Sequence, residues 1–215
     1  MKNRLITYLI GLMLLALGVS LNTQTGLGLS PIISIAYLWS QGTGLDFSLT
    51  AFFYNLVLCV VQILLYSTKG KIPWLHVAFQ IPAAFLSSAF MSFYFLFIPN
   101  FASLPAQHWL NSLAARLVIL LIAFICIGIG ASMMIQAKLS PMPPDGVLQA
   151  LALYLPSWRI GSIKNLFDAS SAAITLLLSF VLSIPNHGIG IGTILGVICV
   201  GRVMAWAEKC LYSKR

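Results

Sequence analysis

The residues of this sequence that could do chemistry are polar side chains inside otherwise apolar stretches. Asp168 and Arg202 each lie well inside a long apolar run. An ionisable group within a membrane is costly, so such residues commonly mark proton, ion or substrate pathways. The two residues could form a structural ion pair, or Asp168 could carry a proton or contact a solute. Both roles hold together if the pair breaks during transport.

A second set of polar residues belongs to a segment that occurs twice. Residues 18–31 match residues 130–143 at an offset of 112 (130 − 18 = 112). In each copy an apolar helix runs into a polar segment rich in Gly or Pro, which at membrane depth must be buried in protein or line a wet cavity. The candidate solute ligands are therefore the polar residues in and just after these segments: Asn22, Gln24, Thr25, Ser30, Gln136, Ser140 and Asp145.

Each of these residues also has a purely structural interpretation. Gln24 and Gln136 either line a pathway or hold unwound backbone in place. Asp145 either complements the dipole of a helix that starts there or contacts a solute or ion. Asn55 is the counterpart of Asp168 at an offset of 113 (168 − 55 = 113) and either bonds a neighbouring helix or contacts the solute.

Composition gives the class of protein to which these residues belong. Hydrophobic residues make up 60% of the 215 residues and charged residues 7%, whereas soluble domains carry about 25% charged residues. The chain is therefore expected to be an integral membrane protein with the lipid bilayer as a partner. Its net charge of +8 is spread singly at the ends of apolar runs, which indicates topology signals and no nucleic-acid surface.

Runs of about 20 apolar residues are long enough to cross a bilayer. Two shorter stretches, residues 31–40 and 145–155, would each cover only about 15 Å as helices, so they are predicted to be re-entrant half-helices. Ser30 and Pro31 are good starting residues for the first of these. The fold class is an all-α polytopic membrane protein with two half-helices and six transmembrane helices, at Leu5–Leu21, Phe47–Tyr66, Trp74–Ile98, Leu110–Ile135, Ile163–Ile184 and Ile189–Leu211.

The placement of Lys and Arg predicts how the spans are arranged. These residues concentrate in cytoplasmic loops, and all segments agree if both termini are cytoplasmic. Three spans in each copy then put the second copy into the membrane upside down, as an inverted repeat. The first repeat is residues 1–99, an external connection is residues 100–109, and the second repeat is residues 110–215.

The duplicated segments, together with residues 188–193, resemble the YczE-like, YitT-related group of uncharacterised bacterial membrane proteins. The resemblance implies a bacterial inner-membrane protein and supports the architecture more than any activity. The pattern of that group has Trp-Asp after the proline, where this chain has Ile32-Ile33 in the first copy and Pro144-Asp145 in the second. A role for that aspartate therefore carries over to Asp145 only.

The function these features favour is a small secondary transporter or channel-like permease for a small polar or anionic solute. Two half-helix N-termini would meet near the bilayer midplane, each with free N–H groups and a positive dipole end. A bundle of six short spans is thin, which favours a homodimer. The alternative is a non-transporting membrane module that anchors or assists a partner enzyme or transport ATPase.

An enzyme is not expected, because no Walker loop, nucleophile elbow or zinc-protease helix is present in the sequence. The scattered His and Cys residues have no metal-ligand spacing, so no cofactor or metal is expected. The glycine run Gly188-x-Gly190-x-Gly192 follows no predicted strand and fits close helix packing better than phosphate binding.

Overall fold

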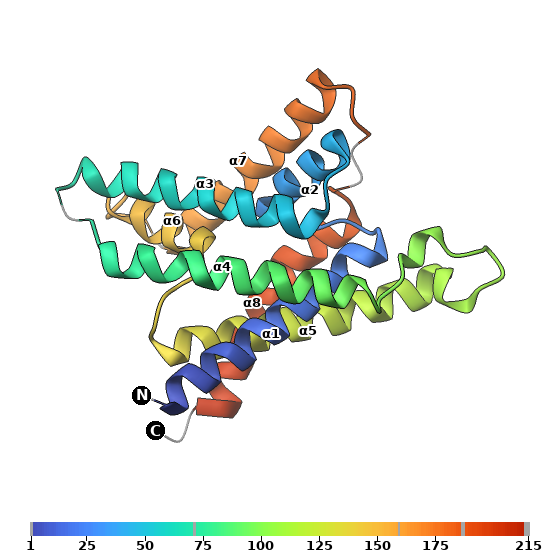
Figure 1. Ribbon diagram of the computed structural model, residues 1–215, viewed down its shortest axis with the longest axis horizontal. Coiled ribbons are helices and arrows are strands. Elements are labelled where there is room, and N and C mark those ends of the chain that lie inside the picture. Colours follow the sequence, from blue (N-terminus) through green and yellow to red (C-terminus); the bar gives the residue numbers. More distant parts are fainter. Residues whose placement is uncertain (1, 71, 159, 186–187, 213–215) are drawn as a thin grey trace. The chain divides into compact units, whose positions relative to one another are not determined.

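The computed structural model describes residues 2–70, 72–158, 160–185 and 188–212, and every regular element among them is helical. Eight α-helices and two short 3-10 turns follow one another along these residues (Figure 1). Their bounds are α1 (Lys2–Thr25), α2 (Pro31–Thr43), α3 (Phe47–Ser67), α4 (Trp74–Phe95), η1 (Phe101–Ser103), η2 (Trp109–Asn111), α5 (Leu113–Ala137), α6 (Pro143–Ala152), α7 (Ile160–Val181) and α8 (Ile191–Tyr212).

Four of these helices are long and apolar enough to cross a membrane, namely α1, α3, α4 and α5. α8 contains a shorter apolar stretch, Ile191–Ala207, and α7 is not among the four. Helices α2 and α6 are 13 and 10 residues long, so both are short helices, as the sequence predicted. The all-helical fold expected from the sequence is confirmed at this level.

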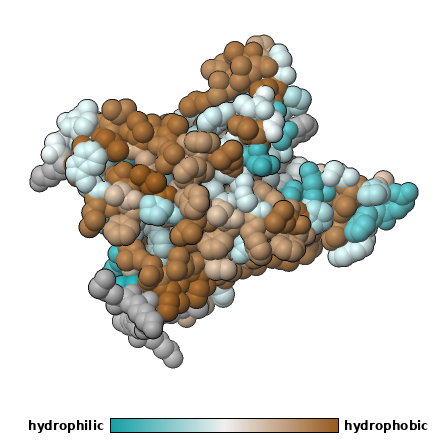
Figure 2. All heavy atoms as spheres, viewed as in Figure 1, coloured by the Kyte–Doolittle hydropathy of each residue, from teal (hydrophilic) through white to brown (hydrophobic). Residues whose placement is uncertain are grey.

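The surface of the long helices is apolar, as a lipid environment requires. Brown, apolar side chains dominate the face seen in Figure 2. Phe180 on α7 is 85% exposed, and Leu96 beyond α4 is 79% exposed. Soluble proteins rarely leave large contiguous apolar patches open to water. These faces, together with the four long apolar helices, identify a helical membrane protein.

Helices α1 and α5 run further than the sequence suggested. The sequence predicted unwound segments beginning at Asn22 and at Gln136, but α1 continues to Thr25 and α5 continues to Ala137. The turns between 22 and 25 lack any helix breaker, and helix propagation costs little once a long helix has formed. The unwound segments are therefore limited to residues 26–30 and 138–142.

Left-handed residues that stop helices recur at nearly constant offsets along the sequence. Gly26 (φ 61°) follows α1 and Lys138 (φ 51°) follows α5, and these positions differ by 112. Gly70 (φ 74°) follows α3 and Ser183 (φ 53°) follows α7, and these positions differ by 113. A left-handed residue is a common end to a helix because it lets the last carbonyl groups find partners.

The described helices fall into two compact units. The first unit holds α1, α5, α8 and the end of α4, and the second holds α2, α3, α6, α7 and the beginning of α4. The candidate polar residues are divided between the two units. Each unit therefore has its own packing and its own polar groups.

In the first unit, α1 (blue) and α5 (yellow-green) pack antiparallel through glycines (Figure 1). A Cβ atom on Gly11 would lie 2.8 Å from the carbonyl oxygen of Gly130, and one on Gly18 would lie 2.7 Å from that of Ala123. Small residues allow this close approach of two membrane helices. The two contacts are related by the offset of 112, because Gly11 and Ala123 are 112 residues apart and so are Gly18 and Gly130.

The segment after α1 docks through its backbone on the glycine run at the start of α8. The amide of Gly192 donates to the carbonyl of Leu27 (2.7 Å). Gly28 has φ 113°, and a Cβ atom there would lie 2.5 Å from the amide nitrogen of Gly190. The glycines are needed for this close backbone contact, which is made with the unwound segment after α1.

In the second unit, each short helix packs on a long helix that is distant in the sequence. α2 lies against α7, where the Ser34 and Thr175 hydroxyl groups are hydrogen-bonded (2.8 Å) and buried. α6 lies against α3, where a Cβ atom on Gly146 would overlap Oε1 of Gln62. These two contacts are also equivalent, because Ser34 and Gly146 differ by 112 and Gln62 and Thr175 by 113.

Candidate functional site

The end of α1 is fixed by two hydrogen bonds to the surrounding chain. Nε2 of Gln24 donates to the carbonyl of Ile98 (3.0 Å), and Nε of Arg116 donates to the carbonyl of Thr25 (2.6 Å). Gln24 therefore holds backbone in place, which is one of the two roles expected for it. Arg116 places a positive charge at the C-terminal end of α1, where the helix dipole favours it.

Asn22 lies one turn earlier and is almost completely buried. It is 4% exposed, and its Oδ1 atom has no hydrogen-bond partner within the described residues. The Thr25 hydroxyl donates to the backbone carbonyl of Asn22 (2.7 Å) and so leaves the side-chain oxygen unpaired. An unsatisfied buried acceptor costs about 1–3 kcal/mol. A ligand role for Asn22 stays a prediction.

The second duplicated segment is held in a different way. Gln136 is half-buried in the last turn of α5, and Ser140 donates from Oγ to the carbonyl of His76 at the start of α4 (2.9 Å). Ser30 is exposed in front of α2. Ser30 and Gln136 belong to the first unit and Ser140 to the second, so the solute site expected between the two segments stays a prediction.

Asn55 and Asp168, which are 113 residues apart, form different hydrogen bonds within their own helices. Nδ2 of Asn55 donates to the carbonyl of Ala51 one turn earlier in α3 (2.9 Å). Asp168 accepts through Oδ2 from the ammonium group of Lys164, one turn earlier in α7 (2.8 Å). The partners differ by the same offset of 113 as the two residues themselves. The amide of Asn55 therefore bonds within its own helix.

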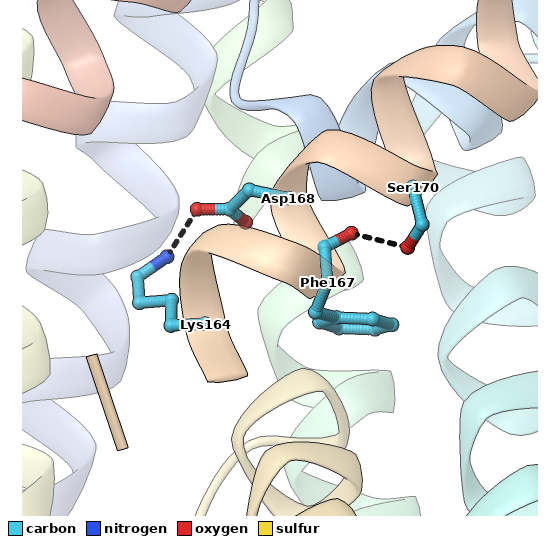
Figure 3. Close-up of polar contacts among 4 residues, drawn as sticks. All are labelled: Lys164, Phe167, Asp168 and Ser170. Carbon is cyan, nitrogen blue, oxygen red and sulfur yellow. Dashed lines mark hydrogen bonds and ion pairs between the residues drawn. The ribbon is translucent and has the colours of Figure 1, made fainter. Parts of the chain in front are cut away.

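The pair of Lys164 and Asp168 combines a buried carboxylate with an accessible cation. The two side chains lie on the same side of α7, while Phe167 points away from them (Figure 3). The side chain of Asp168 is 6% exposed and that of Lys164 is 49% exposed. Oδ1 of Asp168 is buried and has no partner among the described residues. Half of the hydrogen-bonding capacity of this carboxylate is unused.

The sequence left open whether Asp168 pairs with Arg202, and the structure pairs Asp168 with Lys164. Residues four apart on a helix are neighbours, so this pair forms without any long-range packing. Arg202 is exposed on α8 in the first unit. An additional Asp168–Arg202 pair stays a prediction.

Asp145 lies in the first turn of α6 and is coupled to this pair. The residue keeps solvent-exposed surface. Helix α6 packs on α7, and the charges of Lys164 and Asp168 on α7 act on the Asp145 carboxyl group. Two carboxylates and one ammonium group therefore act on one another between α6 and α7.

The start of α6 has few free backbone donors. Pro143 and Pro144 occupy the first two helical positions and carry no N–H group. The amide of Gly146 already donates to the carbonyl of Met142 (2.9 Å). Most helices offer four free N–H groups at this end. The start of α6 therefore lacks the donors that would make it a good anion site.

On its other side, the first turn of α6 meets a chain of buried polar groups. Sγ of Cys59 donates to Oε1 of Gln80 (3.5 Å), and Nε2 of Gln80 donates to Oε1 of Gln62 (3.2 Å). Gln80 and Gln62 are 0% and 1% exposed. Oε1 of Gln62 lies directly against Gly146, since no side chain would fit between them. We call Gln62, Asp145, Gly146, Lys164 and Asp168 the α6 cluster.

Of the α6 cluster, the sequence identified Asp145 and Asp168 as site residues and missed the others. Lys164 is one of the basic residues near the ends of apolar runs that were interpreted together as topology signals, although its spacing from Asp168 was a readable signal. Gln62 was a polar residue inside an apolar run, which is also a signal. The approach of Gly146 to Gln62 depends on the packing of α3 against α6 and has no local sequence signature.

Comparisons with known proteins give a family but no activity. The family model described as "Family of unknown function (DUF6198)" matches residues 2–209. The chain is 27% identical over 198 residues to the "Uncharacterized protein YyaS" of Bacillus subtilis (strain 168), which covers 92% of this chain and 88% of the relative. No solved structure matches the chain.

Proposed function

The chain belongs to the DUF6198 family, a family of unknown function, and we propose that this member is a small secondary transporter or channel-like permease. It would move a small polar solute without changing it chemically. The observation that carries the proposal is the buried carboxylate of Asp168, which has one oxygen paired and one unpaired. Ionisable residues inside membrane helices are functional sites by default, because their burial is costly.

The proposed architecture has six spans, α1, α3, α4, α5, α7 and α8, and two re-entrant half-helices, α2 and α6. The two halves form an inverted repeat. Three sets of equivalent features support this: the glycine contacts of α1 with α5, the reciprocal contacts of the two short helices, and the left-handed helix stops. When a two-fold axis relates two similar units, a contact from the first unit to the second is repeated by the equivalent contact from the second to the first.

The proposed location is the bacterial inner membrane, with both termini in the cytoplasm. The basic residues support this orientation, because Lys69 and Lys138 would share the cytoplasmic side with Lys2, while the connection between α4 and α5 contains no Lys or Arg before Arg116. The resemblance to the YczE-like group belongs to the same proposal and agrees with an uncharacterised bacterial relative.

In the proposed mechanism, Asp168 is the residue that couples solute binding to movement. Its ion pair acts on Asp145 in the first turn of the half-helix α6, and α6 packs on both α3 and α7. A short helix that begins inside the membrane offers a site that spans on both sides can reach. A change of charge at Asp168 would then alter the packing of α6 and α7 together.

The test is ligand-dependent thermal stabilisation of the purified full chain across small amines, anions, amino acids, thiols and vitamins. A ligand that binds only the folded state stabilises it by RT ln(1 + [L]/Kd), about 2.7 kcal/mol at one hundred times Kd. We expect a hit that is lost in Asp168→Asn. Asp46→Asn is the matched control, because Asp46 is an exposed loop aspartate in front of α3.

Loss of the hit in both aspartate variants would place the effect outside the α6 cluster. No hit across the whole panel would contradict a solute site. Co-purification of a partner protein in that case would favour the non-transporting module that anchors or assists a partner enzyme or transport ATPase.

A further inference from the structure

The charges of the α6 cluster define the class of ligand that it can accept. We propose that the cluster binds a small organic solute through a primary ammonium group, which displaces Nζ of Lys164 from Asp168. The inference deepens the proposed permease function and rests on it only for what happens to the ligand after binding.

The first argument is the composition of the cluster. Asp145 and Asp168 bring two carboxyl groups, and Lys164 brings one ammonium group. Lys164 and Asp168 are the charged groups on α7 that act on the Asp145 carboxyl group, and α2, which also packs on α7, has no charged residue. Carboxyl oxygens accept hydrogen bonds from an ammonium group, and the cluster offers two carboxyl groups against one cation, so it favours a cation over an anion.

The second argument is that the structure already holds an ammonium group at this place. Nζ of Lys164 lies 2.8 Å from Oδ2 of Asp168, a normal length for a charge-assisted bond. The Lys164 side chain is 49% exposed and has a flexible four-carbon stem, whereas the carboxylate is 6% exposed. The lysine can therefore swing out to solvent while the carboxylate stays, and a solute ammonium could take its position.

The third argument is the unused hydrogen-bonding capacity around the same turn of α6. Oδ1 of Asp168 is a buried acceptor with no partner among the described residues. A solute ammonium has three donors and can use Oδ1 as well as Oδ2.

An anionic ligand is disfavoured by the same turn. Prolines at the first two positions remove two of the backbone donors that bind anions at helix starts, and Asp145 follows them directly. The sequence alone suggested a polar or anionic solute because it considered the helix dipole. The Asp145 carboxyl group stands at this helix start, where an anion would have to bind to meet the dipole.

The experiment measures the thermal unfolding of the full chain with methylammonium chloride, against sodium chloride at equal ionic strength, tetramethylammonium and acetate. Lys164 competes as a tethered ligand with an effective concentration in the millimolar range. The wild type should therefore be stabilised at millimolar methylammonium. In Lys164→Gln, the methylammonium concentration that gives half of the maximal stabilisation should fall about tenfold or more, because the tethered competitor is gone. Asp168→Asn should not respond to methylammonium, either alone or combined with Lys164→Gln. Asp46→Asn should behave as wild type.

Equal stabilisation by sodium or tetramethylammonium would overturn the proposal, and so would an unchanged response of Asp168→Asn. If Lys164→Gln does not fold, binding of radiolabelled methylammonium to the wild type decides: competition by ethylammonium supports the proposal, and competition by acetate or no binding overturns it. Binding without flux in liposomes would contradict the permease alone. Flux of neutral solutes without ammonium binding would contradict this inference alone.

Discussion

Gly146 is the residue on which the contact between α6 and α3 depends. A Cβ atom there would overlap Oε1 of Gln62 and lie 2.7 Å from Nε2 of Gln80. Both amides are buried and bonded to one another, so neither can move away without losing a partner. The close fit explains why a glycine stands inside a helix, where glycine is otherwise unfavourable.

We predict that Gly146→Ala lowers the free energy of unfolding by about 1–3 kcal/mol, the usual cost of overpacking. Denaturant unfolding in micelles measures the change. The matched control is Gly201→Ala, also in a helix, where a Cβ atom meets nothing within 4 Å. The control should be neutral or slightly stabilising, because alanine is the better helix former. Equal effects of the two substitutions would show that the close contact at Gly146 does not form.

At the scale of single residues, the sequence was informative where a signal was local. Asp168 could be identified because a carboxylate inside an apolar run is costly. Its partner Lys164 could have been found from the four-residue spacing, whereas only the distant Arg202 was considered. Gln62 could not be assigned a role, because its neighbour Gly146 is far along the chain and reaches it only through the packing of α6 on α3.

At the scale of elements, the contact between α1 and α5 is the most specific packing in the first unit. Gly11 and Gly130 face one another so closely that a Cβ atom on either would lie within 2.8 Å of the other's carbonyl oxygen. Backbone atoms cannot rearrange as a flexible side chain can. The two helices must therefore separate to admit an alanine.

We predict that Gly11→Ala and Gly130→Ala each destabilise the protein by about 1–3 kcal/mol. Once one alanine has separated the helices, the second should cost less, so the double variant should show a coupling energy within the range of about 0.5–3 kcal/mol seen for contacting residues. A double-mutant cycle on unfolding in micelles measures it. Strictly additive effects would contradict a direct contact, and pairing Gly11→Ala with Gly201→Ala is the control for additivity.

Helix existence was predictable from the sequence, and helix ends were less so. Phe47 and Trp74 begin α3 and α4 where the apolar runs begin. The ends of α1 and α5 were placed too early, because polar residues such as Gln24 were taken to interrupt the helix. A polar side chain inside a helix is tolerated when it finds a partner, as Gln24 does at the carbonyl of Ile98.

At the scale of the whole molecule, the account predicts where loops lie relative to the membrane. The proposed inverted repeat puts the turn after α3 in the cytoplasm and the connection between α4 and α5 outside. Lys69 and Gln107 are exposed residues in these two places. Their accessibility from outside the cell distinguishes six spans from eight.

After replacement of Cys59, Cys126, Cys199 and Cys210, Gln107→Cys should react with an impermeant maleimide on intact cells. Lys69→Cys should react only after the membrane is opened, because the positive-inside rule places its basic turn in the cytoplasm. Labelling of Lys69→Cys on intact cells would contradict the inverted repeat. Equal expression of both variants is the control.

The grouping of the helices into units was the feature that the sequence predicted least well. The repeat was visible as matches at a nearly constant offset, and the division into two compact units was not. The two units draw on segments from both copies, so the division appears only when helices distant in the chain have packed. The candidate site residues of α6 and α7 come together inside one unit for that reason.

Solute flux into liposomes that contain the purified protein tests the central claim most directly. We would follow osmotic recovery by light scattering for methylammonium, urea, glycerol and acetate, with empty liposomes and Asp46→Asn as controls. The account predicts that the wild type accelerates entry of methylammonium and that Asp168→Asn does not. Entry rates equal to those of empty liposomes for every solute, with the protein folded, would contradict a permease.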